Sequence, residues 1–117
     1  MIFSADLPIP PSANNLFATY NGRRIISRAY KAWRKEAGES LIEQWRAADE
    51  PIIDKPYQVH IELNVNHQGD IANREKAITD LLVATIPGFP NDNWVNRMLI
   101  ERNREIPAAR VEVMTLP

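Results

Sequence analysis

The stretch of residues 57–103 constrains the fold more than any other part of the chain, because the spacing of its hydrophobic residues changes twice. In residues 57–65 every second residue is hydrophobic, which is the period of a β-strand with one buried face. Asp70 can then cap a helix over residues 71–85, and residues 94–103 again favour a strand. A strand, a helix and a strand in this order predict a crossover unit.

A second helix and three more strands are predicted on either side of this unit. Residues 2–7 form a short strand that a run of prolines ends, and residues 23–26 form another strand that pairs with it. Residues 27–46 form a long helix that begins with a capping serine, and residues 109–116 form the last strand. Hydrophobic residues follow one stripe of the long helix, namely Tyr30, Trp33, Ala37, Leu41 and Trp45.

These elements together predict an α+β fold. A single two-layer domain spans residues 1–117, and a mixed β-sheet packs against two main helices in the order β-β-α-β-α-β-β. The length of 117 residues suits one such domain. No hydrophobic run approaches the ~18 residues of a membrane span, and the chain does not start like a signal peptide. We therefore expect no membrane partner and a cytoplasmic location.

Any metal in this protein is expected to sit on oxygen or histidine ligands, because the sequence contains no cysteine. His60 lies on the polar side of the alternating strand, and His67 lies in the turn that follows it. The spacing of the two histidines is not that of a metal site. For His60 the sequence favours a solvent-facing or structural role.

Asp70, Lys76 and Asp92 fall at the start of the predicted second helix, within it and in the loop after it. Mg²⁺ is held by a few carboxylate oxygens, waters and substrate phosphates, and a nearby lysine can add a positive charge for phosphodiester cleavage. The three residues therefore form a candidate metal-dependent nuclease site. The alternative is purely structural, with a helix cap, a solvated lysine and a turn-forming aspartate.

The formal net charge of −1 argues against nucleic-acid binding by bulk charge, but the positive charges are unevenly distributed. Residues 22–35 include six basic residues and no acidic one: Arg23, Arg24, Arg28, Lys31, Arg34 and Lys35. This segregation predicts a local basic face on a nearly neutral protein. The alternative is an ordinary solvated helix face.

Three segments resemble the RusA-type Holliday-junction resolvase family, and together they extend over most of the chain. LPIPPSANNLF is similar to the family's Leu-Pro-x-Pro-Pro-Ser-x-Asn stretch, and GDIANREKAITDLL to its Asp-x-Asp-Asn-x-x-Lys-x-x-x-Asp helix. NDNWV resembles its Asp-Asp-x-x-Val segment. The resemblance implies a small homodimeric endonuclease, of bacteria or of a phage or prophage, that cuts four-way DNA junctions in recombination and repair. It also implies Mg²⁺ as the cofactor, with Mn²⁺ as a possible substitute.

The resemblance also implies a role for individual residues. Asp70 and Asp92 correspond to metal-binding, catalytic aspartates, and Lys76 corresponds to the catalytic lysine. Asn73 matches the asparagine of the helix motif, and Asp80 matches a further acidic position.

Two positions depart from the family pattern. Ala72 stands where the second aspartate of the Asp-x-Asp pair is expected and offers no ligand, which predicts weaker Mg²⁺ binding and an impaired enzyme. Asn91 replaces the first aspartate of the Asp-Asp pair, but its carbonyl oxygen still makes it a candidate metal ligand beside the two aspartates. Glu75 or Glu62 could supply a further oxygen, although solvent-facing or ion-pair roles are the alternative for both.

A junction resolvase recognises the shape of its substrate through phosphate contacts, so basic and amide side chains are the candidate DNA-binding residues. They are Asn14, Arg23, Arg24, Arg28, Lys31, Arg34 and Asn73. Two symmetric cuts call for two active sites and hence a homodimer, for which Trp33, Trp45 or Trp94 could provide apolar surface. Two other functions remain open: a catalytically impaired family member that binds branched DNA without cleaving it, and a small dimeric interaction protein with no nucleic-acid partner.

Overall fold

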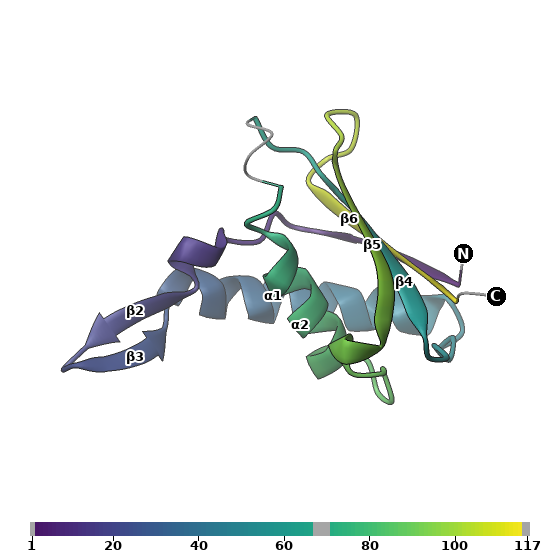
Figure 1. Ribbon diagram of the computed structural model, residues 1–117, viewed down its shortest axis with the longest axis horizontal. Helices are drawn as coiled ribbons and strands as arrows, with labels where there is room; N and C mark the ends of the chain where they lie inside the picture. The colour runs from purple at the N-terminus through teal and green to yellow at the C-terminus, as the bar shows by residue number, and fades with distance from the viewer. Residues whose placement is uncertain (1, 67–70, 116–117) are drawn as a thin grey trace.

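The computed structural model describes residues 2–66 and 71–115, which form a four-stranded β-sheet, a separate β-hairpin and two α-helices (Figure 1). The strands of the sheet are β1 (Phe3–Leu7), β4 (Tyr57–Leu63), β5 (Val95–Arg102) and β6 (Ala109–Thr115). The helices are α1 (Arg28–Ala47) and α2 (Glu75–Thr85). The hairpin contains β2 (Phe17–Tyr20) and β3 (Arg23–Ile26), and η1 (Ala13–Asn15) and η3 (Asp92–Trp94) are short 3-10 helices. The predicted α+β class is confirmed.

The sheet has the strand order β1-β6-β4-β5, with parallel and antiparallel neighbours. β4 and β5 run parallel and α2 connects them, which confirms the predicted crossover unit. β6 is antiparallel to both β1 and β4, so the last strand lies between the first strand and the crossover unit. Tyr57 at the start of β4 pairs with Val95 at the start of β5. The segment that leads into β5 is therefore held beside the start of β4.

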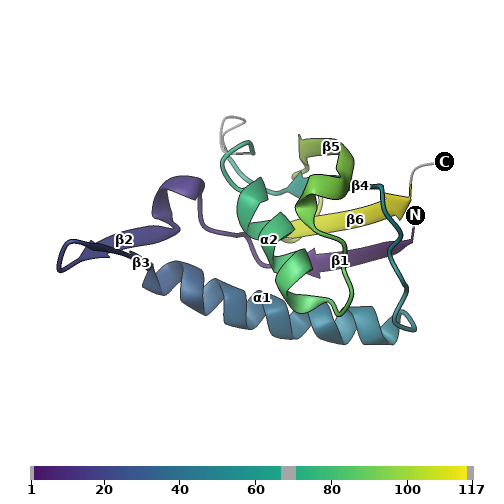
Figure 2. The same ribbon diagram turned by 60° about the horizontal axis from the view of Figure 1, so that its bottom comes forward.

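Both helices pack on the same face of the sheet, as Figure 2 shows, and α1 also contacts α2. The alternating residues of β4 and β6 that face the helices are fully buried, among them Ile61 and Val111. Ser27 caps α1, because its hydroxyl oxygen accepts a hydrogen bond from Tyr30 N at 3.1 Å. The strand period and the helix cap predicted from the sequence are therefore confirmed.

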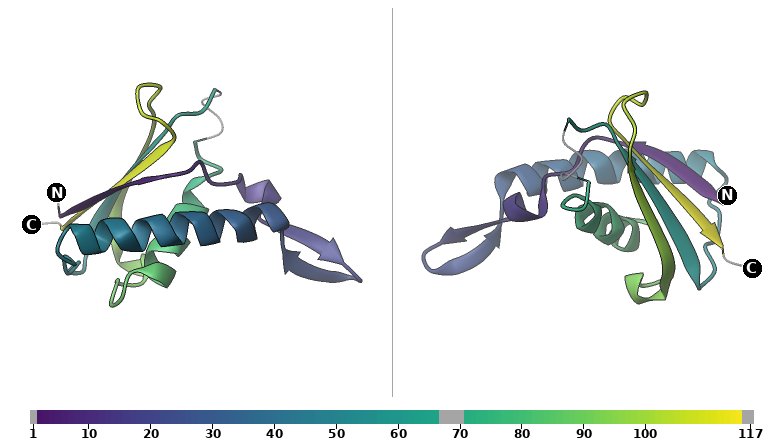
Figure 3. Two further views of the ribbon diagram at one scale, coloured as in Figure 1. Left: turned by 180° about the vertical axis from the view of Figure 1, so that it is seen from behind. Right: turned by 45° about the horizontal axis from the view of Figure 1, so that its top comes forward.

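The predicted pairing of residues 23–26 is wrong. These residues form β3, but β3 pairs with β2 and not with β1, and the resulting hairpin extends away from the sheet (Figure 3). Asn21 and Gly22 connect the two strands with φ angles of 51° and 74°, the left-handed values of a tight two-residue turn. The observed order is therefore β-β-β-α-β-α-β-β. The Asn-Gly pair between two runs of strand-forming residues is the sequence signal for this hairpin.

The predicted start of the second helix is also wrong. Asp70, the expected cap, lies outside the described residues, and α2 begins only at Glu75. Residues 71–74 form a bend and turns. The Asn73 carbonyl accepts a hydrogen bond from Ala13 N at 2.6 Å. Contact with the N-terminal loop therefore holds this segment in a non-helical conformation.

Trp33 and Trp45 are core residues and do not supply apolar surface for a dimer. They are only 5% and 7% exposed. Their indole N–H groups donate to the carbonyls of Pro8 and Pro51 at 2.9 and 3.0 Å, so their polar atoms are also satisfied inside the chain. Trp94 alone of the three predicted tryptophans is substantially exposed, at 42%.

Candidate functional site

Lys76 and Asp92, which are 16 residues apart in the sequence, lie beside each other in the fold. Lys76 is in the first turn of α2, and Asp92 begins η3, which leads into β5. Lys76 Nζ is 3.4 Å from Asp92 Oδ2 and 3.1 Å from Asp80 Oδ1. A hydrogen bond to Asp80 and the charges of both carboxylates raise the pKa of Lys76, so its ammonium group stays charged at neutral pH. The crossover unit thus brings two of the three predicted catalytic residues together.

The Lys76–Asp92 pair is open to solvent. The two side chains are 56% and 43% exposed. An exposed ion pair of this kind stabilises a fold by only ~0–1 kcal/mol, so folding does not require it. Its exposure leaves the Asp92 carboxylate accessible to a cation or to a phosphate group.

A buried tyrosine positions the loop that carries Asp92. Tyr57 is 1% exposed, and its hydroxyl group donates to the Pro90 carbonyl at 3.1 Å. Burial, with a smaller effect from the charge of Asp92, raises the pKa of Tyr57 to about 12, so the phenol keeps its proton at neutral pH. Phe89 packs edge-on against the Tyr57 ring at a centroid distance of 5.1 Å. These contacts hold the segment before Asp92 against the start of β4.

The structure describes two of the three predicted metal ligands, Asn91 and Asp92. Asp70 lies outside the described residues. Asn91 Oδ1 caps η3 by accepting from Asn93 N at 3.2 Å, and this oxygen retains a second lone pair. Mg²⁺ is commonly bound through one or two carboxylates with waters and substrate phosphates, so the exposed Asp92 carboxylate and the Asn91 oxygen fit such an ion.

The other candidate ligands contribute less. Glu62 lies on the sheet face opposite α2, so it cannot supplement Asp92, and it accepts a hydrogen bond from Asn103 Nδ2 at 2.5 Å. Glu75 Oε2 is 3.3 Å from Thr79 Oγ1 within α2. The Ala72 side chain is exposed in the turn before α2 and brings no oxygen.

The N-terminal loop packs against the turn that precedes α2. Besides the bond from Ala13 N to the Asn73 carbonyl, Arg74 Nη1 donates to the Pro10 carbonyl at 2.5 Å. Asn14 directly follows Ala13 in η1. Two of the predicted DNA-binding residues, Asn14 and Asn73, therefore belong to segments that are joined by hydrogen bonds.

The predicted basic residues lie on the hairpin strand β3 and on the N-terminal half of α1, and we call them the basic surface: Arg23, Arg24, Arg28, Lys31 and Arg34. Two of them lie over aromatic rings. The Arg24 guanidinium is 3.9 Å from the centre of the Phe17 ring, and that of Arg34 is 5.5 Å from the centre of the Tyr30 ring. Arg34 also lines a groove with Asp80, the carboxylate that pairs with Lys76. One end of the basic surface, at Arg34, therefore lies near the Lys76–Asp80 ion pair.

Sequence reasoning missed Tyr57 and Arg74 as residues that position this site. Tyr57 was expected only as the first hydrophobic residue of a strand, and Arg74 as a helix residue. Both donate to main-chain carbonyls distant in sequence, at Pro90 and Pro10. No pattern in the sequence signals either contact.

Comparison with known proteins assigns the chain to a family. No curated protein matches the sequence. In the part of the chain that the structure describes, no helix has the length and hydropathy needed to cross a membrane. The family model described as endodeoxyribonuclease RusA matches residues 8–115, a range that includes Lys76, Asp92 and the whole basic surface. The chain therefore belongs to the RusA family of endodeoxyribonucleases.

Proposed function

We propose that this protein is a divalent-metal-dependent endonuclease that cleaves four-way junctions or related branched DNA in recombination and repair. The observation that carries the proposal is the 3.4 Å approach of Lys76 Nζ to Asp92 Oδ2 in a chain of the RusA family. Hydrolysis of a phosphodiester by an activated water needs a cation site and a positive charge near the phosphate. Mg²⁺ is the proposed ion, and Mn²⁺ is the proposed substitute.

Each residue of the site has a separate role in this proposal. Asp92 and Asp70 hold the cation, and Asn91 adds the remaining lone pair of its oxygen. The bound cation supplies a Lewis acid and a water molecule of lowered pKa. Lys76 places its charge beside the phosphate oxygens, where negative charge accumulates during the attack. Asp80, 3.1 Å from Lys76 Nζ, keeps this ammonium group protonated and restricts its position.

Binding of the branched DNA is assigned to the basic surface together with Asn14 and Asn73. Phosphate contacts from these side chains suit recognition of shape rather than of sequence. We further propose a homodimer, because two symmetric cuts require two copies of the site. Exposed apolar side chains that could contribute to its interface are Phe17, Tyr20 and Trp94.

A second candidate function is binding of branched DNA without cleavage. The observation that favours it is the exposed Ala72 side chain, which stands beside the start of α2 where the family pattern has an aspartate. One carboxylate fewer lowers the affinity of the site for a hard dication, because this affinity depends on ligand charge and oxygen count.

Incubation of the purified protein with a labelled four-way junction tests both candidates. We expect strand cleavage with Mg²⁺ or Mn²⁺ and none after EDTA is added, because the water and the phosphate both need the cation. A linear duplex with the sequence of one junction arm is the control and should be cut far less. Junction binding without cleavage in either metal would favour the second candidate, and no binding even at low salt would contradict both.

Single arginine substitutions in the basic surface are expected to weaken junction binding and its salt dependence. Arg24→Gln and Arg34→Gln each remove one phosphate contact, so the slope of log Kd against log salt should decrease by about 1. Fluorescence anisotropy over a series of salt concentrations measures this slope. Arg102→Gln is the matched control, because Arg102 is not part of the basic surface. It lies at the end of β5 and donates to the Asn66 carbonyl at 3.0 Å. Equal slopes for all these proteins would contradict the assignment of the basic surface.

A further inference from the structure

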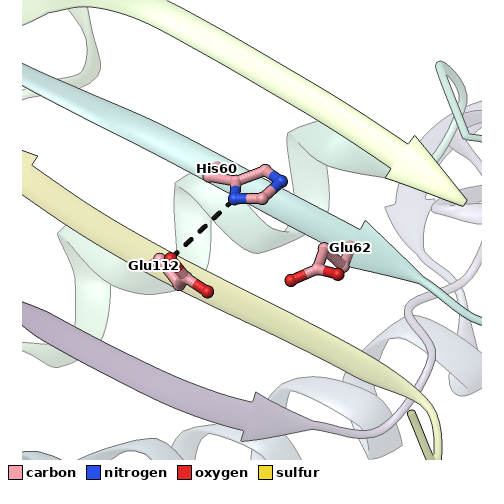
Figure 4. Close-up of side chains that lie close together, drawn as sticks. All are labelled: His60, Glu62 and Glu112. Carbon is pink, nitrogen blue, oxygen red and sulfur yellow. Dashed lines mark ion pairs between the residues drawn. The ribbon is translucent and has the colours of Figure 1, made fainter. Parts of the chain in front are cut away.

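The sheet face that points away from the helices carries a cluster of ionisable side chains. His60 and Glu62 come from the central strand β4, Glu112 comes from β6, and Glu101 comes from β5. β6 and β5 are the two neighbours of β4 in the sheet. Figure 4 shows three of these side chains in front of the strands, with helices behind the sheet. The cluster therefore lies on the opposite side of the sheet from α2 and Lys76.

Three of these residues lie close enough together to share one metal ion. One ligand atom from each of His60, Glu62 and Glu112 can be chosen so that all three lie within 4.8 Å of one another. His60 Nδ1 is 3.8 Å from Glu112 Oε2. The side chains of His60 and Glu112 are 18% and 26% exposed, so they are partly shielded but open to a solvated ion. A single cation could be reached by all three ligands with small side-chain rotations.

Two outer contacts orient these ligands. His60 Nε2 is 2.7 Å from Glu101 Oε1, and donation of the Nε2 proton to Glu101 leaves Nδ1 with a lone pair. Metal-binding histidines characteristically donate their second N–H to a carboxylate in this way. Asn103 Nδ2 donates to Glu62 Oε2 at 2.5 Å and holds that carboxylate in place. The cluster thus has both ligands and the supporting hydrogen bonds that orient them.

The charge balance of the cluster also favours a cation. In the tautomer with the proton on Nε2, the Nδ1 lone pair faces Glu112 Oε2 at 3.8 Å, so both atoms are available as ligands to one ion. Among residues 2–66 and 71–115, no lysine or arginine nitrogen lies within 4.0 Å of the Glu62 or Glu112 carboxylates. A bound dication would make favourable contacts with one ligand atom of each of the three residues.

We propose that His60, Glu62 and Glu112 form a binding site for a first-row transition-metal dication such as Zn²⁺, separate from the nuclease site. An imidazole nitrogen beside two carboxylates suits Zn²⁺, whereas Mg²⁺ prefers oxygen ligands in octahedral geometry. Three protein ligands leave a coordination position for water. The ion joins β4 to β6, so its binding to the folded chain stabilises the sheet.

Zn²⁺ titration of the tag-free protein tests this site without any nuclease assay. The sequence has no cysteine and only two histidines, so few other groups compete for the ion. Calorimetry should show saturable Zn²⁺ binding, and Zn²⁺ should raise the thermal unfolding midpoint more than an equal concentration of Mg²⁺ does, in the wild-type protein and equally in Asp92→Asn. The visible absorption of bound Co²⁺ reports its coordination geometry as a second readout. Wild-type protein that binds Zn²⁺ no better than Mg²⁺ would overturn the proposal.

Matched variants identify the ligands. His60→Asn and Glu112→Gln should weaken Zn²⁺ binding by at least about 100-fold, and Glu101→Gln, which alters only the outer contact, by about 10–100-fold. His67→Asn and Asp92→Asn should leave the Zn²⁺ affinity of the cluster unchanged. Circular dichroism checks that each variant is folded. Unchanged affinity in both His60→Asn and Glu112→Gln, or a loss in His67→Asn instead, would overturn the assignment.

Discussion

Replacing Asp92 with asparagine is expected to lower the rate of junction cleavage by about 100- to 1000-fold, because it weakens the hold on the proposed cation, and a single electrostatic contact that stabilises the developing charge contributes a factor of this size. The substitution preserves the size of the side chain and removes the charge that is proposed to hold the cation. Asn91, and not Asp92, caps η3 through Asn93 N, so the loop should keep its structure. Thermal unfolding should accordingly show a change of less than about 0.5 kcal/mol in stability. Single-turnover cleavage of a labelled junction at saturating protein measures the rate.

Asp80→Asn is the matched control for this substitution. Asp80 pairs with the same lysine and is equally exposed, with a 42% exposed side chain against 43% for Asp92. It is not a proposed metal ligand, so its replacement should reduce cleavage only through the position of Lys76, by roughly tenfold. A loss as large as that of Asp92→Asn would show that both aspartates act through Lys76 and not through a bound cation.

The sequence predicts the elements of this fold that have one buried face. The five hydrophobic residues of the predicted helix stripe are the buried residues of α1, and β4 alternates buried and partly exposed residues over its whole length. The hairpin contradicts the predicted pairing because all residues of β2 and β3 are exposed. A strand without a buried face has no hydrophobic period to read, so only the Asn21–Gly22 turn indicates it.

The site is predictable only in part, for a related reason. The sequence places Lys76 on α2 and Asp92 in the loop after it, and the crossover unit returns that loop to the sheet beside β4, but the 3.4 Å approach of the two side chains depends on the fold of the loop. The contacts of Tyr57 and Arg74 do not follow from any pattern, because a hydroxyl or guanidinium group can donate to any accessible carbonyl. The late start of α2 at Glu75 is not predictable for the same reason. The N-terminal loop forms a hydrogen bond with the segment before Glu75, and no sequence pattern indicates this bond.

Introducing a carboxylate at position 72 is expected to increase cleavage. The Ala72 side chain is exposed in the turn before α2, so a longer polar side chain has room there. Negative charge near the N-terminus of a helix is also favourable. A further carboxylate raises the affinity of an oxygen site for Mg²⁺. Ala72→Asp should therefore lower the Mg²⁺ concentration for half-maximal cleavage by about tenfold, equivalent to ~1.4 kcal/mol of binding.

Ala72→Asn separates the effect of charge from that of side-chain size. It adds a polar group of nearly the same shape as aspartate but no charge. Its Mg²⁺ concentration for half-maximal single-turnover cleavage should therefore stay close to that of the wild-type protein. Equal gains in the two variants would mean that charge does not limit the site. If the unchanged chain binds junctions without cutting them and Ala72→Asp restores cleavage, the missing carboxylate is what separates a binding protein from a nuclease. No gain in either variant, despite normal junction binding, would contradict a metal site that includes position 72.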